Sequence, residues 1–97
     1  VRLDMAFHST IVRSTGNDCL IRMYEAIGKM VEYLSVRTNQ FLVSEQNPDN
    51  LLMLGSQHMA IYRAIKLGFP ELARQAMEKH IDFCANSCLH NRNLRQA

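Results

Sequence analysis

The sequence predicts an all-α fold, an antiparallel helical bundle with about four helices. Apolar residues recur at three- and four-residue steps along most of the 97 residues, which is the spacing of one helix face. No segment shows the apolar and polar alternation of a half-buried strand, and Gly16, Gly68 and Pro70 separate the periodic stretches. A chain of this length forms one domain at most, so we expect a helical domain over residues 1–90 and a polar tail over residues 91–97.

The first two predicted helices cover residues 3–13 and a longer stretch that runs from residue 18 to about residue 41. The first is expected to end at the turn around Gly16. Asn17 or Asp18 then caps the second, whose apolar stripe is backed by a face of charged residues.

The last two predicted helices follow a polar connection. Asn47 and Pro48 have the pattern of a helix cap followed by proline at the first helical position, so the third helix should run from there to about Lys66. Gly68 closes it, and Pro70 opens the fourth. Short turns between these helices predict antiparallel neighbours.

Three of the four histidines fall on the apolar faces of separate predicted helices. His8 also has a carboxylate, that of Asp4, one helical turn before it, so both side chains can reach one ion. Taken singly, a histidine such as His58 or His80 is more often a core residue bonded to a backbone carbonyl or a tyrosine. The coincidence of three histidines with one carboxylate makes metal binding an equal alternative.

The donor types limit the metal. Three imidazoles and one carboxylate suit Zn(II), Ni(II), Mn(II) or Fe(II), whereas a nitrogen-rich set argues against Ca(II) and Mg(II). A second candidate set, His80 with Cys84 and Cys88, has the wrong spacing, because positions i and i+8 lie about 12 Å apart along a helix. These two cysteines are better explained as small thiols in a helix seam.

Composition excludes several classes of protein. The formal net charge is only +2 and the basic residues are scattered, so the chain has no nucleic-acid-binding face of its own. No apolar run approaches the roughly 18 to 20 residues of a membrane span, and no signal peptide opens the chain. Three cysteines without a framework spacing fit a reducing compartment, and we expect the cytoplasm. Because the first residue is not Met and already reads as helix, we expect the chain to be the later part of a longer protein.

The motifs around these histidines are specific in spacing. They are Asp4-x-x-Phe7-His8, then Ile11 and Thr15-Gly16-Asn17, then His58-x-x-Ile61-x-x-Ala64-Ile65, then Ala73-x-x-Ala76-Met77-x-x-His80. Together they resemble the FCD ligand-binding domain of FadR-subfamily GntR transcription regulators, over about residues 4–83.

The resemblance implies a bundle of six or seven helices with a divalent metal held by Asp4, His8, His58 and His80. Zinc is the first expectation, with nickel and manganese as alternatives. The metal would help to hold a small carboxylate effector, an organic or sugar acid, and Arg37 and Thr38 are expected to face that effector. DNA would be bound only through an N-terminal winged helix-turn-helix outside these residues, in a homodimer, without catalysis.

Two rival interpretations stay open at this point. One is a small helical metalloenzyme that activates water at an open metal position, although Glu78, two residues before His80, should point away from the helix face that carries His80. The other is a dimerisation bundle without any ligand. The chain also departs from the family at Phe69-Pro70, where a small polar or acidic residue is usual, so the last helix must be capped differently.

Overall fold

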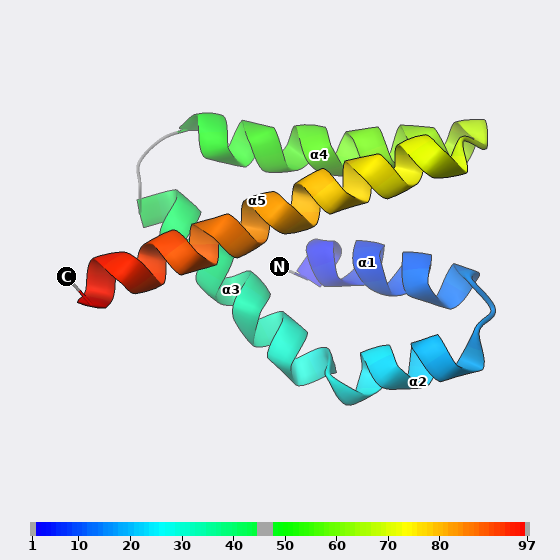
Figure 1. Cartoon of the computed structure of the whole chain (residues 1–97), viewed down its shortest axis with the longest axis horizontal. Helices are drawn as coiled ribbons and strands as arrows, with labels where there is room; N and C mark the ends of the chain where they lie inside the picture. The colour runs from blue at the N-terminus through cyan, green and yellow to red at the C-terminus, as the bar shows by residue number, and fades with distance from the viewer. Residues whose placement is uncertain (1, 45–47, 97) are drawn as a thin grey trace. The chain divides into compact units, whose positions relative to one another are not determined.

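The computed structural model describes the backbone of residues 2–44 and 48–96 and the side chains of residues 3–43 and 48–87. All regular structure in these ranges is helical, which confirms the predicted fold class. The five helices are α1 (Arg2–Ser14), α2 (Asp18–Ala26), α3 (Gly28–Ser44), α4 (Pro48–Leu67) and α5 (Pro70–Gln96) (Figure 1). Their contacts divide the chain into two compact units, Val1–Asn39 and Gln40–Ala97. None of the described helices has both the length and the apolar character that crossing a membrane requires.

The first unit contains an antiparallel pair, α1 and α2, joined by a tight turn (Figure 1). Gly16 in this turn has a φ of 65°, in the left-handed region that glycine adopts without steric cost. Asn17 then caps α2, because its side chain accepts a hydrogen bond from the amide of Leu20 at 3.1 Å. Of the two caps that the sequence allowed, the structure therefore selects Asn17, and Asp18 takes the first helical position.

The single long helix expected after residue 18 is wrong, because it is two helices that meet at Ile27. Ile27 ends α2 with φ −97° and ψ 8°, and its carbonyl accepts the first hydrogen bond of α3, from Val31, at 3.0 Å. The next residue, Gly28, lacks a side chain and costs a helix interior about 1 kcal/mol relative to alanine. The apolar stripe continues across this break, so its periodicity did not reveal it.

The apolar stripe of α2 and α3 is also less buried than expected. Tyr24 and Val31 are half-buried, whereas Met23 and Met30 are 62% and 65% exposed. Periodicity identifies the residues that share a helix face, but it does not say how much of that face is covered. The same correction applies to residues that the periodicity places on the later stripes, among them Leu51, Tyr62, Ile65 and Ile81.

The second unit is built on α4 and α5, which lie side by side in opposite directions (Figure 1). The turn between them closes on Gly68, which has a φ of 77°. Its amide bonds to the carbonyl of Ile65 at 3.1 Å, and the amide of Phe69 bonds to that of Ala64 at 2.9 Å. This pair of bonds is the Schellman motif, which satisfies the last carbonyls of α4 and reverses the chain.

The apolar core of the second unit is small. Phe41 and Leu42, near the end of α3, are buried, as are Ile61 and Ala64 of α4. Ile61 is the most deeply placed, with 1% of its surface exposed. Two buried polar side chains of α5, His80 and Ser87, belong to the same unit.

The ends of α4 and α5 follow the prolines, as predicted. Pro48 begins α4, while the cap expected at Asn47 lies outside the described residues. At the start of α5 the carbonyl of Phe69 accepts the first helical hydrogen bond, from Ala73 at 3.0 Å, so a residue without a side-chain acceptor occupies the cap position. α5 then continues to Gln96, and the division of the chain at residue 90 stays a prediction.

Candidate functional site

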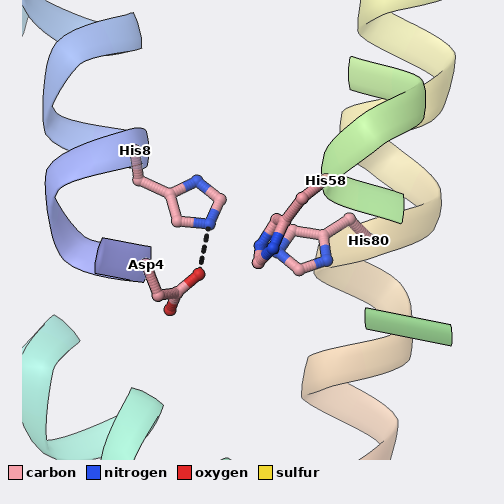
Figure 2. Close-up of side chains that lie close together, drawn as sticks. All are labelled: Asp4, His8, His58 and His80. Atoms are coloured by element: carbon pink, nitrogen blue, oxygen red, sulfur yellow. Dashed lines mark hydrogen bonds and ion pairs between the residues drawn. The ribbon is translucent and has the colours of Figure 1, made fainter. Parts of the chain in front are cut away.

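Asp4 and His8 form a pair on α1, as their spacing predicts. The Nε2 of His8 lies 3.3 Å from Oδ1 of Asp4, and each side chain retains only 21% of its exposure (Figure 2). The two residues are one helical turn apart, so the α1 backbone alone sets their separation. A partly buried carboxylate beside an imidazole is suited to bind a cation.

His58 and His80 form a second pair, across the two helices of the α4–α5 hairpin. Their Nε2 atoms are 3.2 Å apart, and their ring centroids are 4.5 Å apart with the planes at 63° (Figure 2). His80 is buried, with 4% of its surface exposed, and His58 is half-buried. Because two imidazolium rings this close would repel each other, at least one ring is neutral.

The separations within both pairs fit two ligands of one metal ion. With metal–ligand bonds of about 2.0 to 2.1 Å, tetrahedral geometry places donor atoms about 3.3 to 3.4 Å apart. Ideal octahedral geometry at the same bond length brings them to about 2.9 Å. The observed 3.3 Å of Asp4 with His8 and 3.2 Å of His58 with His80 lie nearer to the tetrahedral value. Each pair is thus spaced as half of a metal site.

Gln57 contacts His80, and the sequence did not indicate this contact. Its Oε1 lies 2.9 Å from Nδ1 of His80, so it contacts the ring nitrogen that does not face His58. Metal-binding histidines usually hold their second nitrogen by such a hydrogen bond. The only signal in the sequence is that Gln57 precedes His58, and this adjacency does not show that its side chain reaches α5.

Tyr24 is a second residue whose role the sequence did not indicate, because its spacing shows only that it lies on the apolar stripe of its helix. Its hydroxyl is buried, and no hydrogen-bond partner for it occurs among the described side chains. Burial raises the pKa of Tyr24, and the negative charge of Asp4 raises it further. The Tyr24 hydroxyl and the Asp4 carboxylate therefore share one electrostatic environment in the first unit.

Arg37 and Thr38, the residues expected to face an effector, lie on α3. The guanidinium carbon of Arg37 lies over the ring of Tyr33, 5.8 Å from its centroid, and Arg37 is half-buried. Thr38 is buried, with 5% of its surface exposed. The contact of Arg37 with the Tyr33 ring is of the cation–π kind.

Two further residues close to His80 along the chain, Glu78 and Cys84, differ in their exposure. Glu78 is exposed and its carboxylate pairs with Arg74, which confirms that it points away from the apolar stripe. Cys84 is half-buried, and the side chain of Cys88 lies outside the described residues.

An open groove on the first unit runs between α1 and the α2–α3 junction. It is lined by Met5, Ala6, Ser9, Tyr24, Glu25, Gly28, Lys29 and Glu32. Two carboxylates and one ammonium give this lining a net negative charge, so it is poorly suited to an acidic effector.

Comparison with protein families finds one match: the model of the FCD domain fits residues 1–83. The matched residues include all four metal-ligand candidates and both effector candidates. Neither the curated proteins nor the solved structures contain a match to this chain.

Proposed function

The chain belongs to the FCD domain family, and from this premise we propose that it is the effector-sensing domain of a GntR-type transcription regulator of the FadR subfamily. In this proposal the domain binds a divalent metal and a small carboxylate metabolite. DNA is bound by an N-terminal winged helix-turn-helix outside the printed sequence, in the cytoplasm of a bacterium.

The observation that carries the metal proposal is the spacing within the two donor pairs. Each pair sits within one compact unit and has the donor separation of two ligands of one ion. We propose that the four side chains complete one coordination sphere, with a carboxylate oxygen from Asp4 and one ring nitrogen from each of His8, His58 and His80.

The metal expected here is zinc. The donor separations are closer to tetrahedral than to octahedral geometry, and zinc prefers four-coordinate tetrahedral sites with nitrogen and oxygen ligands. Nickel and manganese are the alternatives that the same donors accept. When bound, the metal supplies positive charge, and an exchangeable coordination position where an effector carboxylate can bind.

Arg37 is proposed to bind the carboxylate of the effector directly, in addition to the metal. A guanidinium binds a carboxylate through two parallel hydrogen bonds, and the cation–π contact with Tyr33 favours one placement of the Arg37 side chain before the effector binds. Thr38 adds a hydroxyl at the next position along α3.

The regulatory mechanism is linkage between the effector and the arrangement of helices. The helices are taken to exchange between two arrangements. An effector shifts the populations of these arrangements only as far as its affinity for one exceeds its affinity for the other. We propose that the regulator acts as a homodimer. The large exposed apolar residues of α4 and α5, such as Leu52 and Leu72, are of a type that drives association.

Two measurements test the function against its rivals. Metal analysis of the purified chain should find about one zinc per chain before chelation and none after it. A protein that contains no metal and is unaffected by chelators would favour a purely structural bundle. Calorimetry with small hydroxy and sugar acids, on metal-loaded and chelated protein, should show binding only with metal. Turnover of such an acid by the loaded protein would instead support the metalloenzyme, for which Glu78 offers no base at the site.

A further inference from the structure

The two ring nitrogens of His80 have different neighbours. Nδ1 faces the amide oxygen of Gln57 at 2.9 Å, and Nε2 faces Nε2 of His58 at 3.2 Å. Gln57 and His58 are adjacent on α4, so one stretch of that helix contacts both edges of the His80 ring. All three residues belong to the second unit.

The contact with Gln57 decides where the His80 proton lies. An amide oxygen only accepts hydrogen bonds, so the Nδ1 that faces it must carry the proton. In its neutral form the His80 imidazole has one N–H, which leaves Nε2 with a lone pair. Metals bind histidine through such an unprotonated nitrogen.

We propose that Gln57 is a positioning residue that holds His80 as its Nδ1–H tautomer and thereby keeps Nε2 available as a metal ligand. The metal part of this inference rests on the proposed function, whereas the tautomer part rests only on the two contacts of His80.

The same reasoning assigns different roles to the two histidines. Because Nε2 of His80 is an acceptor, the 3.2 Å contact requires Nε2 of His58 to donate to it in the metal-free chain. Before His58 can bind a metal through Nε2, its proton must move to its own Nδ1, with no net change in charge. His80 is thus prepared for the metal in advance, whereas His58 has to change tautomer.

The test compares two substitutions of Gln57 in the full chain. In Gln57→Leu the Nδ1 proton loses its acceptor, and we expect zinc affinity to fall by about 10- to 100-fold, the usual effect of removing such a partner. In Gln57→Glu the carboxylate can only accept, so His80 should keep its tautomer and bind zinc at least as tightly as the wild type. Gln75→Leu, at an exposed position of α5, is the matched control and should leave zinc affinity unchanged.

Two readouts keep the outcomes distinct. Zinc affinity is measured by competition with a chromophoric chelator, and the tautomer of His80 is read from its ring ¹⁵N shifts by NMR in the metal-free chain. A wild-type His80 protonated at Nε2, or a Gln57→Leu chain with unchanged tautomer and zinc affinity, would overturn the inference. If the wild type takes up neither zinc nor nickel nor manganese, the proposed function fails, and the ¹⁵N shifts still decide whether Gln57 sets the tautomer.

Discussion

Replacing His80 and replacing Arg37 should have separable effects, because one residue is proposed to bind the metal and the other the effector. His80→Ala removes a ligand atom at a position with 4% exposure, and it also takes away the partner of Gln57 and of His58. Losing an outer partner of a ligand costs about 10- to 100-fold in metal affinity, so losing the ligand itself should cost more than about 100-fold. The variant should therefore lose metal to a chelator that the wild type resists, and it should lose acid binding together with the metal.

Arg37→Ala should weaken acid binding and leave the metal in place. A hydrogen bond to a charged group contributes about 1.5 to 3 kcal/mol, which corresponds to roughly 10- to 150-fold in affinity. Arg37 is only half-buried, so we expect the lower part of that range, about 10- to 30-fold. Arg37→Lys is the control: it keeps the charge but loses the planar fork, and it should recover only part of the affinity.

Calorimetry and metal analysis on the same preparations test these expectations together. Acid affinity that is equal with and without metal would refute the link between metal and effector, because the metal would then be structural. Loss of metal in Arg37→Ala would refute the assignment of separate roles to Arg37 and His80.

Three further predictions concern stability. Zinc at 100 times its dissociation constant should stabilise the fold by about 2.7 kcal/mol, which raises the melting temperature by roughly 10 to 20 °C in a chain of this size, and a chelator should reverse the shift. Ile61→Ala empties the most deeply buried apolar position and should lower the free energy of unfolding by about 2 to 5 kcal/mol in urea titrations, whereas a cost below about 1 kcal/mol would contradict the core described above. The raised pKa of Tyr24 means that its contribution to stability is intact below its ordinary pKa of 10.0 and is lost as the pH rises through the raised value. Tyr24→Phe should remove this part of the alkaline loss in urea titrations between about pH 8 and 11, and an unchanged profile would show that Tyr24 does not cause it.

The helix ends that are set by a capping residue, a proline or a glycine could be predicted from the sequence. Asn17, Pro48 and Pro70 each begin a helix by a local mechanism, either a side-chain cap or a fixed φ, and Gly68 ends one by adopting a positive φ. The break at Ile27 could not be predicted in this way. A lone glycine is tolerated within many helices, and the apolar stripe keeps its period on both sides of the break.

The donor pairs were predictable to different degrees. Asp4 and His8 are one turn apart on one helix, so their approach follows from α-helix geometry alone. The approach of His58 to His80 depends on how α4 and α5 pack; their places on apolar helix faces made it an alternative, and the family resemblance then favoured it. The role of Gln57 depends on a side-chain torsion and on the position of a partner 23 residues away, which residue type does not determine.

The chain between His58 and His80, which includes the turn at Gly68, should tolerate insertions and deletions poorly. Exposed turns usually accept added residues, and nothing in the burial of Gly68 would prevent it. However, His58 and His80 lie 22 residues apart on either side of this turn, and a residue added within α4 after His58 would rotate it by about 100° and shift it by about 1.5 Å relative to the turn. Natural variation in this segment should therefore consist of substitutions at constant length.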